Sequence, residues 1–190
     1  MINIKNFITR SIVTFFGVGR IAYAPGTFGS LCAFPLLIWL LRFAEKRGIF
    51  IYYSPLQFIF FIIVILTITG IYAISEYIKI AKNNDPSEVV IDEVVGQLIT
   101  IVGIFYFFTF IPENMLVSLV LFFKNIYNLI YFKLMSSFIL FRLFDILKPW
   151  PVSFADQKVK GGFGVMLDDI FAAILAVLAF FVILSICHLF

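Results

Sequence analysis

The chain has 190 residues, of which 63% are hydrophobic and only 13% are charged. A mean hydropathy of +1.09 excludes an ordinary soluble globule, and a net charge of +3 without a basic stripe or zinc-ligand spacing excludes a nucleic-acid module. We therefore expect a single domain over residues 1–190. Its predicted fold class is all-α, a polytopic integral membrane protein with about four to five membrane helices and polar loops on one face.

Apolar runs along the chain predict the helices. Residues 1–16 carry Lys5 and Arg10 before a short apolar stretch, which is typical of a lead-in helix at the membrane surface. The run 30–43 is short for a crossing and contains Pro35, so it is either a short span or a re-entrant helix. Four further runs are predicted to cross the membrane: 49–74, 94–111, about 126–141 and 170–190.

Five crossings would place the segments 1–29, 76–93 and 142–169 on one side of the membrane. That side holds nine of the fourteen basic residues, and the positive-inside rule makes it cytoplasmic. Three basic residues fall on the other side and count against this orientation: Arg42, Lys46 and Arg47.

Seven of the eleven acidic residues fall in three short clusters near the ends of the apolar runs. The clusters hold Asp85, Glu88, Asp92 and Glu93, then Asp145, then Asp168 and Asp169. A carboxylate near a membrane is costly, so gathered carboxylates indicate a polar site. Together with nearby Arg and Lys residues, they are suited to holding Mg²⁺ and a phosphate group.

The first cluster is interpreted as the start of a helix, with Asp85 as its cap and Pro86 in its first position. At about 100° per residue, one stripe of that helix would carry three acids and a glycine: Asp85, Glu88, Asp92 and Gly96. Three carboxylates on one stripe repel each other unless a cation lies among them. Asp85 as a cap alone and Glu88 as a solvated acid remain open alternatives.

Arg142 and Asp145 are three residues apart, so they share a helical face and can pair. Lys148 follows three residues later, before Pro149 and Pro151 end the helix. The group is either a structural ion pair with a snorkelling lysine or a phosphate clamp, in which Arg142 is a planar fork and Lys148 a point charge.

Two glycine-rich segments precede predicted spans. The segment 161–169 is interpreted as a flexible approach to a helix whose N-terminus carries Asp168 and Asp169. Neighbouring acids on a helix point about 100° apart, so both cannot bind one ion equally; one could bind metal while the other orients water or caps the helix. The segment 17–30 offers backbone N–H groups to an anion, or is a tight turn capped by Thr27 or Ser30.

The histidine and the two cysteines give no indication of a catalytic or metal-binding role. The single histidine, His188, stands third from the end, which argues against a histidine nucleophile or a histidine metal cluster. Cys32 and Cys187 lie inside apolar runs and are interpreted as buried inert thiols.

Taken together, these segments resemble the phosphatidylglycerophosphatase A family. The resemblance is carried by Gly19-Arg20, by 24–30 (Ala-Pro-Gly-Thr-Phe-Gly-Ser), by Asp85-Pro86 with 92–96 (Asp-Glu-Val-Val-Gly), by 141–151 (Phe-Arg-Leu-Phe-Asp-Ile-Leu-Lys-Pro-Trp-Pro) and by 161–170 (Gly-Gly-Phe-Gly-Val-Met-Leu-Asp-Asp-Ile). These motifs occur in the family's order over nearly the whole chain. Ala173 departs from the pattern, since the family often has Gly there, and this concerns helix packing.

The resemblance implies a multi-pass enzyme of the bacterial cytoplasmic (inner) membrane, with its active site facing the cytoplasm. It would remove the terminal phosphate of phosphatidylglycerophosphate, giving phosphatidylglycerol and inorganic phosphate, with Mg²⁺ as cofactor. The expected partners are this phospholipid substrate and the lipid bilayer, with no nucleic acid, and the oligomeric state is left open.

Our mechanistic hypothesis assigns catalysis and metal binding to four acids: Asp92, Glu93, Asp168 and Asp169. Phosphate binding is assigned to Arg20, Thr27, Arg142 and Lys148. Supporting roles go to Asp145, which orients the arginine, and to Asp85 and Glu88. The metal would activate water or polarise the phosphoryl oxygens. The alternative is a membrane transporter or ion channel with an interfacial acidic cation site, which would usually place some acids deep within its spans.

Overall fold

The computed structural model describes residues 4–83, 86–111, 113, 117, 119, 122 and 125–188. Across these residues the chain forms helices and no strand. Four of the described helices are long and apolar enough to cross a membrane: α2 (Pro25–Lys46), α3 (Pro55–Ala81), α4 (Ile91–Phe107) and α8 (Gly161–His188). The expectation of an all-α polytopic membrane protein is confirmed.

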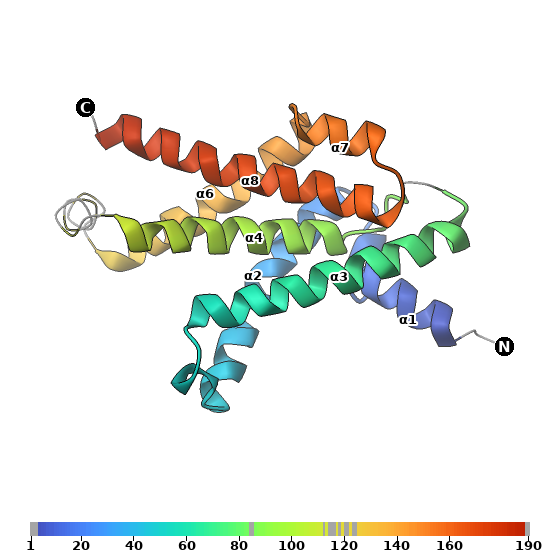
Figure 1. The fold of residues 1–190 in the computed structure, drawn as a ribbon, viewed down its shortest axis with the longest axis horizontal. Helices are drawn as coiled ribbons and strands as arrows, with labels where there is room; N and C mark the ends of the chain where they lie inside the picture. The colour runs from blue at the N-terminus through green and yellow to red at the C-terminus, as the bar shows by residue number, and fades with distance from the viewer. Residues whose placement is uncertain are drawn as a thin grey trace.

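A further long helix, α6 (Ile126–Leu147), has 22 residues and packs against α4 and α8. Successive long helices alternate in direction, so the first residues of α2, α4 and α8 lie at the same end of the bundle as the last residues of α3 and α6 (Figure 1). The central helices are α4 and α8, which contact each other and both contact α3 and α6. The bundle therefore brings segments that are distant in the sequence to one end.

Three short elements border this end: α1 (Ile4–Val13), the 3₁₀ turn η1 (Val18–Arg20) and α7 (Val152–Lys158). Helix α1 packs along α3 and α7 packs on α8 (Figure 1). Helix α1 confirms the lead-in helix expected in residues 1–16, whereas α7 has no counterpart among the predicted elements. At the opposite end, the 3₁₀ turn η2 (Ile49–Ile51) joins α2 to α3, and η3 (Phe108–Phe110) prolongs α4.

The observed boundaries of α2 and α3 have local causes. Helix α2 begins five residues before the predicted run, at Pro25, because proline fits the first position of a helix. Its 22 residues continue past Pro35, which favours a span over a re-entrant helix. Helix α3 begins at Pro55 because Ser54 and Gln57 form a reciprocal capping box, with N–H···O distances of 3.2 and 3.0 Å.

The prediction that α4 starts at Pro86 is wrong. The segment 86–90 is not helical, and α4 begins at Ile91 after Val90, which offers no side-chain cap. The backbone of Val90 is instead fixed by tertiary structure, since its N–H donates to the carbonyl of Val13 at 2.9 Å. Glu88 therefore lies off the helix, and the predicted acidic stripe does not form. Asp85 lies outside the described residues.

The prediction that α8 starts at Asp168 is also wrong. The helix begins seven residues earlier, at Gly161, so Asp168 and Asp169 lie inside it rather than at its N-terminus. The cause is close packing against α3: a Cβ atom at Gly162 would lie 2.6 Å from the backbone nitrogen of Ser75. Only glycine permits this approach, and the contact turns a sequence that looks flexible into the first turn of a helix.

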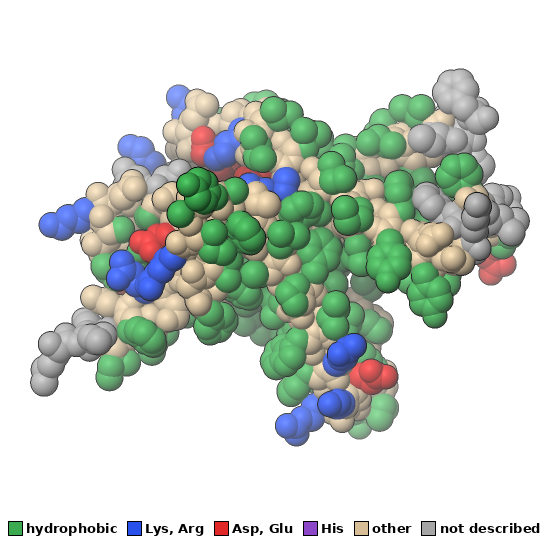
Figure 2. All heavy atoms as spheres, turned by 180° about the vertical axis from the view of Figure 1, so that it is seen from behind, with side chains coloured by type: hydrophobic (Ala, Val, Ile, Leu, Met, Phe, Trp, Pro, Cys, Tyr) green, Lys and Arg blue, Asp and Glu red, His purple; other side chains and the backbone are tan. Residues whose placement is uncertain are grey.

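The surface of the bundle is largely apolar, as a bilayer-embedded protein requires. Figure 2 shows hydrophobic side chains over most of the visible face. Charged side chains gather at the left of that view, which is the end carrying α1 and α7 in Figure 1. A second, smaller group stands near the tip of the lobe projecting at the bottom. The acidic and basic residues of the predicted site lie at the end of the bundle that carries α1 and α7.

Candidate metal and phosphate site

Three carboxylates meet at the centre of the charged end. Asp92 and Glu93 stand in the first turn of α4 and Asp169 stands in α8, and each offers an oxygen within 4.8 Å of the other two. Asp92 is 7% exposed and Asp169 is 3% exposed. The close approach of the helices depends on Gly96, where a Cβ atom would lie 3.2 Å from the Cβ of Asp169. We call these three acids the carboxylate trio.

One buried oxygen of each carboxylate in the trio has no hydrogen-bond donor. Among the described residues, five buried side-chain atoms have no partner, and three of them are oxygens of the trio: Asp92 Oδ1, Glu93 Oε2 and Asp169 Oδ2. A buried carboxylate without a donor is costly, and neighbouring carboxylates repel each other. A divalent cation would remove both costs, and carboxylate oxygens are the ligands that Mg²⁺ prefers. The donor set therefore fits a Mg²⁺ ion.

Asp168 has a different environment from its neighbour Asp169. Its Oδ2 accepts a hydrogen bond from Lys148 Nζ at 2.9 Å, and its Oδ1 accepts from the backbone N–H of Asp169 at 3.1 Å. The two adjacent side chains thus point to different partners, in keeping with the angular separation expected on a helix. Of the four acids assigned to metal, three come together and Asp168 lies outside their group.

Lys148 is held by a second carboxylate that the sequence analysis missed. Its Nζ donates to Asp156 Oδ1 at 2.5 Å, and Asp156 belongs to α7. Burial lowers the pKa of Lys148, but the hydrogen bonds to Asp156 and Asp168 outweigh it, so the net pKa is raised and the ammonium stays charged. One signal was available, because Asp156 is the sole acidic residue between Asp145 and Asp168 in the sequence.

Arg142 and Asp145 form the ion pair that their spacing predicts. The Nη1 of Arg142 also lies 3.5 Å from Ser30 Oγ, while its Nε is a fourth buried atom without a partner. A Cβ atom at Gly26 would lie 3.1 Å from this Nη1 and in contact with Glu93. The first turn of α2 therefore lies against the guanidinium. Thr27, the next residue, is half-buried in that turn, and its backbone N–H donates to the carbonyl of Ala24.

Glu88 and Arg20 belong to a separate cluster. Glu88 accepts a hydrogen bond from the Tyr77 hydroxyl, and its carboxylate lies 3.7 Å from Arg20 Nε and 3.8 Å from Arg10 Nη2. These contacts tie the segment before α4 to α1, η1 and α3. Neither Glu88 nor Arg20 contributes to the carboxylate trio.

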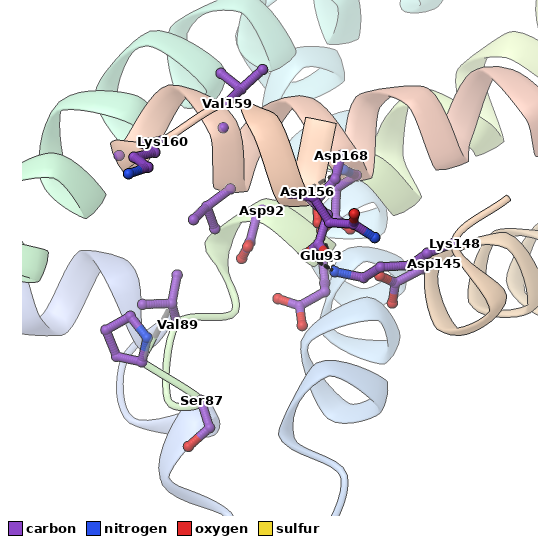
Figure 3. A pocket seen from close by; sticks show the side chains of 16 residues that line it. Ser87, Val89, Asp92, Glu93, Asp145, Lys148, Asp156, Val159, Lys160 and Asp168 are labelled. Carbon is purple, nitrogen blue, oxygen red and sulfur yellow. Dashed lines mark hydrogen bonds and ion pairs between the residues drawn. The ribbon is translucent and has the colours of Figure 1, made fainter. Parts of the chain in front are cut away.

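A cavity of about 370 Å³ opens beside the carboxylate trio and Lys148. Its polar wall contains the trio and five further charged residues: Asp145, Lys148, Asp156, Lys160 and Asp168. Figure 3 shows Glu93, Lys148, Asp156 and Asp168 grouped together, with Asp92 beside them and Ser87 and Val89 across the opening. The carboxylate trio and two lysines thus line one space large enough for a phosphate group.

Comparisons with known proteins identify the family of the chain. The family model described as phosphatidylglycerophosphatase A matches residues 11–184. Phosphatidylglycerophosphatase A of Haemophilus influenzae is 33% identical over 168 residues, covering 88% of this chain and 83% of that protein. The Escherichia coli protein of the same name is 28% identical, covering 85% of this chain and 74% of that protein.

A third relative carries another name. A Bacteroides thetaiotaomicron protein, named as a candidate phosphatidylinositol-3-phosphatase, is 31% identical over 89% of this chain and 89% of its own length. No solved structure matches the chain. The family match covers most of the sequence, and the chain therefore belongs to the phosphatidylglycerophosphatase A family of phosphoric monoester hydrolases.

Proposed function

We propose that the chain hydrolyses the terminal phosphomonoester of phosphatidylglycerophosphate to phosphatidylglycerol and inorganic phosphate, with Mg²⁺ as cofactor. Family membership and the names of the Haemophilus and Escherichia relatives support this reaction. The observation that carries the proposal is the carboxylate trio, in which one buried oxygen of each acid lacks a donor, beside a cavity lined by lysine. We place the protein in the bacterial inner membrane with this cavity toward the cytoplasm.

Asp92, Glu93 and Asp169 would hold the metal. Three carboxylates alone repel a phosphate dianion, so an anionic substrate needs a cation among them. When bound, Mg²⁺ would neutralise phosphoryl oxygens and activate water for attack on phosphorus. The role of the trio is to fix the ion at the cavity wall, and Gly96 keeps the two helices close enough for all three acids to reach it.

Lys148 and Arg142 would bind the phosphoryl group. Lys148 lines the cavity and remains an ammonium. Arg142 is not among the residues that line the cavity, but it lies beside Glu93 and its Nε has no partner. Asp145 fixes the guanidinium by pairing with it. We assign Asp168 to the support of Lys148 rather than to the metal, because both of its oxygens already accept hydrogen bonds.

The position of the cavity suits a lipid substrate. It lies at the end of helices that are long enough to cross a bilayer, so acyl chains can remain in lipid while a headgroup enters. Two exposed aromatic residues at α7, Trp150 and Phe154, are of the kind that gathers at membrane interfaces. The transporter or channel alternative is less well supported, since no acid among the described residues lies midway along a spanning helix.

Phosphate release by the purified protein in detergent micelles tests the proposal. Phosphatidylglycerophosphate and phosphatidylinositol 3-phosphate should be offered in parallel, because the Bacteroides relative carries the second name at a similar identity. We expect faster release from the first lipid, dependence on Mg²⁺ and loss of release in EDTA. Glu45→Gln is a matched control, since Glu45 is an exposed acid at the far end of α2.

Faster release from phosphatidylinositol 3-phosphate would contradict the proposed substrate but would still support a phosphatase activity. Absence of release from both lipids, together with Mg²⁺ flux into proteoliposomes, would establish the transporter alternative instead.

A further inference from the structure

The ammonium of Lys148 is fixed from two sides. Asp168 of α8 accepts from it at 2.9 Å on the buried wall, and Asp156 of α7 accepts from it at 2.5 Å on the outer side. The side chain of Asp168 is 10% exposed and that of Asp156 is 34% exposed. The lysine therefore spans the gap between a buried acid and an acid at the rim of the cavity.

This arrangement leaves part of the ammonium available. A lysine has three N–H donors, and the two carboxylates use two of them. Lys148 and both acids line the same cavity as the carboxylate trio. The third N–H is therefore available to an acceptor in that cavity.

The backbone alone does not place this ammonium. Lys148 is the residue that ends α6, in a left-handed conformation with φ 44°, and its side chain has four rotatable bonds. Asp168 alone would draw the ammonium toward the buried wall between α6 and α8. The second acid, reaching in from α7, opposes that pull and holds the ammonium at the rim.

We propose that Asp156 is a positioning residue, which acts through Lys148 to present its free N–H to the phosphoryl group of the substrate. The inference rests on the proposed function, in which Lys148 binds that group. In this interpretation the structural role of α7 is to position Asp156 at the rim of the cavity.

The sign of the effect separates positioning from simple charge. Asp156 is itself negative, so if it acted only by its charge, its removal would improve the binding of a phosphate dianion and lower KM. If it positions Lys148, its removal frees the ammonium and raises KM. We expect Asp156→Asn to raise KM by about 5- to 20-fold and to change kcat by less than about threefold, from the strength of charged hydrogen bonds at a part-exposed position.

A double-mutant cycle with Lys148→Met tests the path of the effect. Asp156→Asn should add nothing in the Lys148→Met background, because the group through which it acts is gone. Asp156→Glu, which keeps the carboxylate, should retain most of the wild-type KM. Lys158→Gln, an exposed residue of the same helix, is the control and should behave as wild type.

A fall in KM, or an equal loss with and without Lys148, would overturn the inference. Titration of inorganic phosphate into the Mg²⁺-loaded protein by calorimetry provides a readout that needs no turnover, and Asp156→Asn should weaken phosphate binding by the same factor. If the wild type binds phosphate but cleaves neither lipid, the proposed function fails while this titration still decides the role of Asp156. A wild type that does not bind phosphate would overturn both.

Discussion

Asp168 and Asp169 are adjacent in the sequence and on the same helix, yet their surroundings are opposite. Asp168 is supplied with donors by the protein, from Lys148 and from a backbone N–H. Asp169 faces Asp92 and Glu93, and one of its buried oxygens has no partner. The contrast indicates that a buried acid whose two oxygens have partners is part of the scaffold, whereas a group of acids that each keep one buried oxygen without a partner is suited to a cation.

The largest effect should come from the trio. Asp92→Asn or Asp169→Asn should reduce phosphate release by at least about a thousandfold, because each removes a ligand of the proposed metal. Release from phosphatidylglycerophosphate in micelles, measured across a Mg²⁺ titration, gives the result. Activity near the wild-type level in both variants would remove the trio from the mechanism.

Although these substitutions should reduce activity, they should raise the stability of the protein when no metal is present. In EDTA, Asp169→Asn should unfold at a higher temperature than the wild type, since it removes one of three mutually repelling acids, two of them buried and one half-buried. Added Mg²⁺ should raise the unfolding temperature of the wild type more than that of the variant. A Mg²⁺ response that is equal in the two proteins would contradict the comparison.

A packing change should act next most strongly. Gly96→Ala places a methyl group against the Phe141 ring and 3.2 Å from the Cβ of Asp169, so it should push α8 from α4. We expect a stability cost of about 1–3 kcal/mol from overpacking, and a loss of activity of about a hundredfold from misplacing the trio. Gly103→Ala, which overpacks α4 against Val177 away from the site, should cost similar stability with little loss of activity.

Asp168→Asn should have a smaller and different effect from Asp169→Asn. The amide can still accept from Lys148, so activity should fall only about 10- to 30-fold. The Mg²⁺ concentration for half-maximal activity should stay within about threefold of wild type, since Asp168 lies outside the trio. A large shift in the Mg²⁺ requirement would place Asp168 among the metal ligands after all.

Local sequence rules predicted the features that depend on neighbouring residues. Apolar runs located the four helices that are long and apolar enough to cross a membrane, although a fifth crossing was predicted at about 126–141. The three-residue spacing predicted the pair of Arg142 and Asp145. The predicted starts of α4 and α8 were wrong because tertiary contacts decide where these helices begin. These contacts are the backbone hydrogen bond from Val90 to Val13 and the packing of Gly162 on Ser75.

Asp156 and the partners of Glu88 were missed for a similar reason. A lone acid in a segment without a predicted helix has no periodicity to mark it, and only the docking of α7 on α8 brings Asp156 to Lys148. The ties of Glu88 to Arg10 and Arg20 join residues that are more than sixty positions apart. Neither could be read from spacing.

The smallest effect should come from Glu88, whose partners are the side chains of Tyr77, Arg10 and Arg20. Glu88→Gln weakens its contacts with Tyr77, Arg10 and Arg20, and we expect a stability loss of about 1 kcal/mol, since the group is partly exposed. Its neighbours Ser87 and Val89 line the cavity, so activity should also fall, by up to about threefold, with the Mg²⁺ requirement unchanged. Thermal unfolding and phosphate release in micelles measure the two effects.

Glu76→Gln supplies the control for that last prediction. Glu76 also joins α1 to α3, through Lys5 and Lys79, but it does not line the cavity. It should therefore reduce stability without reducing activity. Glu88→Gln could instead raise the Mg²⁺ requirement as strongly as a substitution in the trio. An acid whose partners all come from the protein would then be acting on the metal. That result would contradict the distinction between acids that are paired within the protein and acids that are suited to a cation.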